Sequence, residues 1–280
     1  MKLVTWNIQW GRGSDGRVDL PRLLADARKL ADFDVLCLQE VADGWPDLPG
    51  GAAGNQFRDL ALALPGFSAV EGVATDLPGP GGTRRRFGNL LLTRLPVLQV
   101  LRHQLPWPAD PAVPSMARLV IEATLRAPFG PLRVMTTHLA YYSLRQRLAQ
   151  VQRLRELHQE AVAHARQPRP AEEGPFAALP RGGAALLMGD MNFKPDSPEY
   201  RRLLAPFPDA TPAWTDAWTR LHPGQPHPPT FAPHEGPAPE APYCCDFVFA
   251  SADLLPRLRA LRVDAATTAS DHQPLLLELD

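Results

Sequence analysis

The chain has 280 residues, with 29 Lys and Arg against 30 Asp and Glu, so its formal net charge is −1. A charge near zero excludes a strongly basic protein that coats nucleic acid non-specifically, and 45% hydrophobic residues exclude a disordered chain. Three cysteines, two of them adjacent, form no disulfide framework, so we expect a reducing, cytoplasmic location.

Strands and helices alternate in the first third of the chain. Leucines at helical spacing follow Leu20, and a continuous apolar run between Asp34 and Gln39 indicates a strand that is covered on both faces. The expected elements are a strand at 2–8, a helix at 20–30, a strand at 34–39, a Gly- and Pro-rich loop at 43–55, a helix at 57–64 and a strand at 67–73.

The rest of the chain mixes strand pairs with a few helices. We expect paired strands at 89–93 and 97–103, a hairpin of 118–125 and 132–137, helices at 144–166 and 198–204, and strands at 184–188, 246–250 and 274–278. Residues 205–243 contain 11 Pro and are interpreted as a surface loop excursion, because the strand pattern resumes after them. This order predicts two packed sheets with helices outside, in one domain spanning 1–280. No apolar run reaches the ~18 residues of a membrane span.

Polar side chains stand at the ends of many of these strands. Taken singly, each has an ordinary structural explanation as a turn residue, a strand boundary or a hydrogen-bonded His. Their joint occurrence favours a binding site on loops held by a rigid sheet. The residues concerned are Asn7, Glu40, Asn89, His138, Asp190, Asn192, Asp246, Asp271 and His272.

These residue types suit hydrolysis of a phosphate ester. Glu40 is a hard oxygen ligand for Mg²⁺, and Asp190 and Asn192 are suited to deprotonating and positioning a water. His138 and His272 are suited to hydrogen-bonding a phosphate and stabilising its developing charge. A metal, a carboxylate base and two histidines fit in-line attack on phosphorus.

Seven motifs, taken in chain order, resemble those of the endonuclease/exonuclease/phosphatase superfamily, whose members include DNase I. They are TWN at 5–7, LQEV at 38–41, GNLLLTRLPV at 88–97, TTHL at 136–139, GDMN at 189–192, CDFVFAS at 245–251 and SDHQPL at 270–275. The resemblance covers residues 3–279. It implies a four-layer α/β/β/α sandwich with two packed mixed sheets, and Mg²⁺-dependent cleavage of phosphoester bonds, with Mn²⁺ as a substitute.

The resemblance also implies roles for individual residues. The metal side would comprise Asn7, Glu40 as principal ligand, and Asp271. On the catalytic side, Asp190 would activate the water with Asn192 as its partner, and His272 would lie beside the phosphate with Asp246 behind it. His138 resembles the His of DNase I-like and sphingomyelinase-like members and would protonate the leaving oxygen.

The chain departs from the family pattern at two places. Cys244 stands where the family often has an Arg, two residues before Asp246. The Glu that partners the first His in DNase I-like members has only Glu71 as a candidate here.

Candidate substrate contacts come from Asn89 and from arginines. Arg84 and Arg86, in a basic triplet, could hold an anionic group, and Arg147 with Gln150 follows a pattern common in the family. A solvated loop explains the triplet equally well. Trp214 lies in the Pro-rich excursion, where its aromatic ring would either pin the loop to the core or contact substrate.

The leading hypothesis is therefore a nuclease or phosphodiesterase that acts on a phosphate ester, with nucleic acid as a possible substrate and no obligate protein partner. A phosphomonoesterase or a sphingomyelinase-like lipid phosphodiesterase is the alternative within the enzyme class. A non-catalytic binding module that kept the fold is the remote one.

Overall fold

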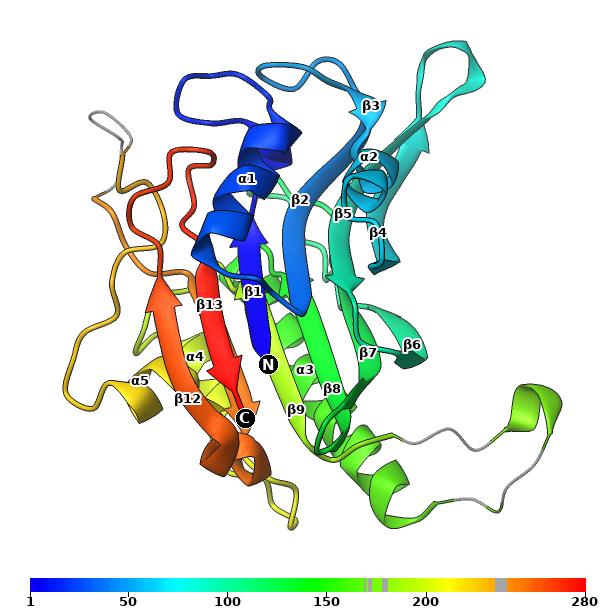
Figure 1. Cartoon of the computed structure of the whole chain (residues 1–280), viewed down its shortest axis with the longest axis vertical. Helices are drawn as coiled ribbons and strands as arrows, with labels where there is room; N and C mark the ends of the chain where they lie inside the picture. The colour runs from blue at the N-terminus through cyan, green and yellow to red at the C-terminus, as the bar shows by residue number, and fades with distance from the viewer. Residues whose placement is uncertain (169, 171–172, 178–180, 235–240) are drawn as a thin grey trace.

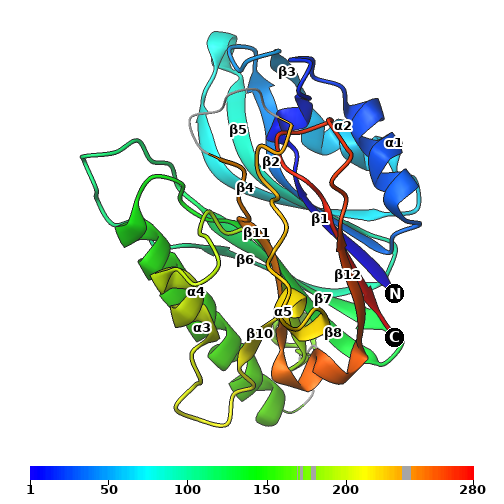
Figure 2. The ribbon, with the colours of Figure 1, turned by 90° about the vertical axis from the view of Figure 1, so that its left-hand side faces the viewer.

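The computed structural model describes residues 1–168, 170, 173–177, 181–234 and 241–280. Two β-sheets pack face to face, and helices cover the outer face of each (Figures 1 and 2). This arrangement is the expected four-layer α/β/β/α sandwich. None of the helices in the described ranges is long and apolar enough to cross a membrane.

Seven described strands form the first sheet, in the order β12-β13-β1-β2-β5-β4, with β3 paired to β2. Strands β1 and β2 run parallel, whereas the other pairs are antiparallel, so the sheet is mixed. The strands are β1 Lys2–Asn7, β2 Val35–Trp45, β3 Ala52–Asn55, β4 Ser68–Pro78, β5 Arg84–Thr93, β12 Leu258–Val263 and β13 Leu275–Leu279.

Six described strands form the second sheet, in the order β10-β11-β9-β8-β7-β6. Only the central pair β8–β9 is parallel, so this sheet is mixed as well. The strands are β6 Val97–Gln104, β7 Leu119–Ala127, β8 Gly130–His138, β9 Ala185–Asp190, β10 Trp214–Asp216 and β11 Asp246–Ser251.

Three apolar layers hold the sandwich together. The middle layer joins the two sheets, with Leu3 and Cys37 of the first facing Ile121 and Val134 of the second. The other two layers join each sheet to its helices, and each fully buried Leu or Phe contributes roughly 1.5–3 kcal/mol of transfer free energy. Because both faces of the central strands are covered, the sequences of these strands are continuous apolar runs.

The helices begin where capping side chains satisfy their first amides. Ser143, for example, accepts a hydrogen bond from the Gln146 amide at 3.1 Å and so starts the longest helix. Helices α1 and α2 cover the first sheet, and α3 and α4 cover the second (Figure 2). The helices are α1 Leu20–Leu30, α2 Gln56–Ala63, α3 Leu144–Arg166, α4 Pro198–Leu204 and α5 Ala217–Leu221, with 3₁₀ turns at Gln9–Gly11, Pro80–Gly82, Gly174–Phe176 and Ala252–Arg257.

Three expectations about individual elements are wrong. Residues 43–55 are not all loop, because β2 continues to Trp45 and pairs with β3. The strands at 89–93 and 97–103 do not pair, because the chain crosses at Pro96 from the first sheet to the edge of the second. The excursion at 205–243 is not entirely loop, since it contributes β10 and α5, and Trp214 within it is 2% exposed in the core.

Candidate active site

Strand register places three of the predicted residues in one row across the second sheet. His138 at the end of β8 pairs with Asp190 at the end of β9, and Asp190 in turn pairs with Asp246 at the start of β11. In the first sheet Asn7, the last residue of β1, pairs with Gln39 of the parallel strand β2, next to Glu40, and β2 continues beyond them to Trp45. The facing sheets therefore bring these residues together at one edge of the sandwich.

The backbone around this edge adopts conformations that the sheet alone would not produce. Glu40 has φ of 61° at a register shift between Leu38 and Val41, which is a bulge that re-aims its side chain. Asn192 also has positive φ, 51°. Gly189 lets β9 approach β8 closely, since a Cβ there would lie 2.1 Å from the Thr137 carbonyl oxygen. Such strain concentrates at functional sites.

Asp190 lies at the centre of the site and is 1% exposed. Its Oδ2 accepts a hydrogen bond from Asn7 Nδ2 at 2.9 Å and lies 3.4 Å from His138 Nε2 and 3.7 Å from His272 Nε2. Its Oδ1 accepts from the backbone amide of Asn192 at 2.9 Å. The carboxylate is thus held between two imidazoles.

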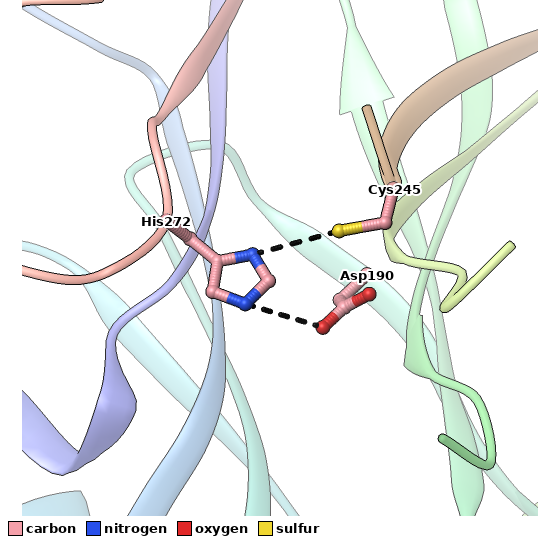
Figure 3. Close-up of side chains that lie close together, drawn as sticks. All are labelled: Asp190, Cys245 and His272. Atoms are coloured by element: carbon pink, nitrogen blue, oxygen red, sulfur yellow. Dashed lines mark hydrogen bonds and ion pairs between the residues drawn. The ribbon is translucent and has the colours of Figure 1, made fainter. Parts of the chain in front are cut away.

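His272 is held from behind by a second carboxylate. Asp246 Oδ2 lies 2.8 Å from His272 Nδ1, which leaves the other ring nitrogen directed at Asp190. Cys245 Sγ is 3.9 Å from the same Nδ1 (Figure 3). Asp190, Cys245 and His272 can each bring one ligand atom within 4.8 Å of the others, but Figure 3 shows Cys245 and Asp190 at different ring nitrogens. Their side chains therefore do not converge on one ion.

The two histidines differ in protonation state at neutral pH. Burial and the positive charge of Arg118 together lower the pKa of His138 to about 3. Burial also opposes protonation of His272, but the carboxylates of Asp246 and Asp190 outweigh it, so the pKa of His272 is well above its ordinary value. One imidazole is neutral and the other is a cation, a separation typical of acid–base sites.

The metal-side residues form a cluster with surplus negative charge. Burial and the charge of Asp271 raise the pKa of Glu40 to about 7, with Asp190 adding to the repulsion. Asn7 Nδ2 donates to Glu40 Oε1 at 3.2 Å, and Gln9 Nε2 donates to Asp271 Oδ2 at 2.6 Å. Neighbouring carboxylates that repel one another suit a hard divalent cation with oxygen ligands, so the donor set fits Mg²⁺ or Mn²⁺.

Arg118 belongs to this neighbourhood, although the sequence did not single it out. It is 8% exposed just before β7, and its Nε has no hydrogen-bond partner among the described residues. Together with Asn89 and His138 it lines a small hollow. The hairpin register could have revealed it, because Val120 pairs with Thr137 and so places Arg118 near the His138 end of β8.

The other predicted substrate contacts already have protein partners. Arg84 Nε donates to Asp76 Oδ1 at 2.7 Å, and Arg86 Nε donates to Asp43 Oδ2 at 2.8 Å. Glu71, the candidate partner of His138, instead lies 3.8 Å from Arg86. The carboxylates beside His138 are those of Asp190 and of Glu40, whose Oε1 is 3.9 Å from Nδ1.

Arg147 lies on the first turn of α3 and is likewise engaged. Its Nε donates to Glu199 Oε1 at 2.7 Å and its Nη1 donates to the Ala140 carbonyl at 3.1 Å. Asn89, on β5, donates through Nδ2 to the Leu119 carbonyl at 3.3 Å. Of these contacts, Asn89 alone shares a hollow with His138, whereas Arg147 lines a separate one beside Asn192.

Comparisons with known proteins give one family. The model of the Endonuclease/Exonuclease/phosphatase family matches residues 4–272, and no curated protein matches. A structure of an endonuclease/exonuclease/phosphatase from Beutenbergia cavernae is similar at 24% identity and a TM-score of 0.67, over 100% of this chain and 71% of that one.

Two further structures share the fold over all of this chain. A 3′ phosphatase from Neisseria bound to a product DNA hairpin has 21% identity and a TM-score of 0.61, with 99% of its chain covered. The human Nocturnin catalytic domain with bound sulfate has 19% identity and a TM-score of 0.62, with 94% covered. Members of the matched family are phosphoester hydrolases that generally use divalent metals. The chain described here belongs to the Endonuclease/Exonuclease/phosphatase family.

Proposed function

We propose that this chain is a Mg²⁺-dependent nuclease or phosphodiesterase that cleaves a P–O bond by in-line attack of a water. The observation that carries the proposal is the position of Asp190, whose Oδ2 lies 3.4 Å from the neutral imidazole of His138 and 3.7 Å from the cationic imidazole of His272. A carboxylate base beside a cation and a neutral donor is suited to generating a nucleophile and stabilising a phosphorane-like charge.

Glu40, Asp271 and Asn7 would hold the metal, because they surround the surplus negative charge that raises the pKa of Glu40. When bound, Mg²⁺ supplies positive charge to the phosphate oxygens. Asp190 takes the proton of the attacking water, and Asn192, whose Nδ2 donates to the Leu139 carbonyl at 2.9 Å, is fixed beside it to orient the water or phosphate.

His272 and His138 divide the remaining work between them. His272, held by Asp246, carries the proton that can stabilise or protonate a phosphate oxygen. His138 is neutral near pH 7, so it donates a hydrogen bond and is a weaker candidate for protonating the leaving oxygen. Arg118 and Asn89 complete the phosphate contacts, and the Nε of Arg118 has no hydrogen-bond partner among the described residues. Arg84, Arg86 and Arg147 would contribute only by breaking their present ion pairs.

A phosphomonoesterase is the second candidate, because structures with this fold include two phosphatases. One is the Neisseria 3′ phosphatase, and the other is a mannosyl-6-phosphatase from Bacteroides thetaiotaomicron, at 16% identity and a TM-score of 0.67 over 100% of this chain and 99% of that one.

The test is a panel of single-stranded DNA, duplex DNA, RNA, sphingomyelin, sugar and inositol phosphates and bis(p-nitrophenyl) phosphate, with Mg²⁺, Mn²⁺ or EDTA. We expect metal-dependent cleavage of a diester that Asp190→Asn abolishes. Hydrolysis of monoesters alone would favour the second candidate, and hydrolysis of nothing would favour a binding module.

A further inference from the structure

Two exposed tyrosines follow directly after the His138 end of β8. Tyr141 is 40% exposed and Tyr142 is 60% exposed, and their rings meet edge to face with centroids 4.6 Å apart at 86°. We call this pair the tyrosine ridge. Large exposed aromatic side chains beside a candidate active site indicate a surface for a ligand.

The backbone of the ridge is fixed by buried groups of α3. The Ala140 amide donates to Gln150 Oε1 at 2.9 Å, and Arg147 Nη1 donates to the Ala140 carbonyl at 3.1 Å. Gln150 is fully buried, and Arg147 is itself held by Glu199. The rings are therefore presented by a rigid turn, so that binding to them costs little backbone entropy.

The ridge separates two hollows, and both tyrosines line each of them. One, of about 510 Å³, also contains Asn192 and Lys194; the other, of about 260 Å³, also contains Arg118 and Met116. Each hollow thus reaches a different residue of the candidate active site. A phosphate held between Asn192 and Arg118 would direct its two ester substituents to opposite sides of the ridge.

The lining of the hollows indicates the chemistry of those substituents. The larger hollow has polar groups from Arg147, Ser197 and Glu199 among its aromatic rings, and Lys194 Nζ lies 4.4 Å from the centroid of Tyr243. Polar groups around aromatic rings suit planar, hydrogen-bonding bases. Bases in single strands can stack on such faces, but bases in a duplex are already stacked on one another.

We propose that the tyrosine ridge is a stacking platform for the nucleobases that flank the scissile phosphate, so that the substrate is single-stranded nucleic acid. This inference rests on the proposed function, because it assumes that a phosphodiester is cleaved beside Asn192 and Arg118. The net charge of −1 agrees with it, since a single strand held by stacking needs fewer phosphate contacts than a duplex.

The test compares an oligothymidylate with an oligomer of the same length whose residues are all abasic tetrahydrofurans. Wild-type protein with Mg²⁺ should cleave both and favour the base-bearing strand through a lower KM. Tyr142→Ala and Tyr141→Ala should each raise KM for the oligothymidylate about tenfold and reduce the preference over the abasic strand, while kcat changes little.

Two control variants accompany them. Tyr142→Phe keeps the ring and should retain the preference. Phe176→Ala, which removes a 64% exposed aromatic on the connection between α3 and β9, is the matched control and should change neither KM.

The outcomes separate this inference from the proposed function. Equal KM values for the two strands, or a preference that survives Tyr141→Ala and Tyr142→Ala, would overturn the stacking platform while the phosphodiesterase remains. A preference for sphingomyelin vesicles over both strands, reduced by Tyr142→Ala, would assign the ridge to a membrane surface and also overturn the inference. Failure of the wild-type protein to cleave either strand or bis(p-nitrophenyl) phosphate would overturn the proposed function and the inference together.

Discussion

Strand β8 carries buried polar groups at both ends, and the two ends differ in charge balance. Near its start, Arg133 is fully buried with Glu122, which also contacts Arg181 at 3.2 Å and His103 at 3.3 Å. At its end, His138 lies among Glu40, Asp190 and Arg118. Both clusters are polar, ionisable and enclosed, so burial alone does not distinguish them.

Glu122, which is 1% exposed, and Glu40, whose side chain is 19% exposed, show the difference. Burial would raise the pKa of Glu122, but the hydrogen bond with His103 and the charges of Arg133 and Arg181 outweigh it and leave that pKa below its ordinary value. The pKa of Glu40 is raised to about 7, because burial and the neighbouring carboxylates act in the same direction. A structural cluster supplies its own counter-charges, whereas the candidate active site is short of a cation.

The largest effect is expected from Asp190→Asn, which removes the proposed base and keeps the size of the side chain. We expect kcat for bis(p-nitrophenyl) phosphate to fall about 10²- to 10⁴-fold, while the free energy of unfolding stays the same or rises because one carboxylate leaves a repulsive cluster. Steady-state kinetics and thermal unfolding measure the two quantities. Retention of full activity would show that Asp190 is not the base.

A substitution at Glu122, near the start of β8, should lower stability and leave activity unchanged. Glu122→Gln leaves the Arg133 guanidinium without its carboxylate in the core, so we expect a loss of about 3 kcal/mol in the free energy of unfolding and unchanged kcat in the folded fraction. Because the folded pKa of Glu122 is lowered, its stabilisation is present above its ordinary pKa and is lost as pH falls below it. Urea unfolding at pH 7 checks the loss, and a variant as stable as wild type would refute the assigned charge balance.

Asp246→Asn tests the carboxylate behind His272. Removing that charge removes a cause that raises the pKa of His272, so the imidazolium should lose its proton at a lower pH. We expect kcat/KM to fall about 10- to 100-fold and the alkaline limb of its pH profile to move to lower pH. An alkaline limb in the same place would show that His272 is not the group that titrates there.

The smallest effect concerns competition between protons and the metal. A carboxyl with a pKa of about 7 must lose its proton before it can bind a cation, so affinity falls as pH decreases. Between pH 8 and pH 6 we expect the apparent Kd for Mg²⁺ to rise about tenfold, which calorimetric titration can measure. In Glu40→Gln the affinity should be weaker throughout and should lose this pH dependence.

Sequence patterns predicted the layers and most elements because strongly periodic segments dominate them. The helix at 144–166 and the apolar strands beside Glu40 and Asp190 follow directly from such periods. Strand β12 was missed because its buried positions recur every third residue, which is not the alternation typical of a strand. The pairing of 97–103 with β7 depends on contacts between distant segments, which local pattern does not contain.

The same distinction between local sequence pattern and contacts of distant segments applies to the candidate site. The structure gathers His138 and Asp190 at one edge because the parallel neighbours β8 and β9 end together, but Glu40 and Asn89 lie within β2 and β5, which are longer than predicted. Arg118 was missed because a single Arg before a strand has no distinctive pattern, and its importance appears only when the hairpin and the facing sheet enclose it. The ion pairs of Arg84 and Arg86 likewise depend on which strands become neighbours.

The most direct test of the charge imbalance is thermal unfolding of the wild type, Glu40→Gln and Glu122→Gln, each in EDTA and in excess Mg²⁺. In EDTA we predict that Glu40→Gln unfolds at or above the wild-type Tm and Glu122→Gln below it. Mg²⁺ should raise the Tm of the wild type and of Glu122→Gln, because it binds the folded state, and should leave Glu40→Gln almost unchanged. A wild-type Tm that does not respond to Mg²⁺ or Mn²⁺, or a Glu40→Gln variant stabilised as much as the wild type, would contradict the account.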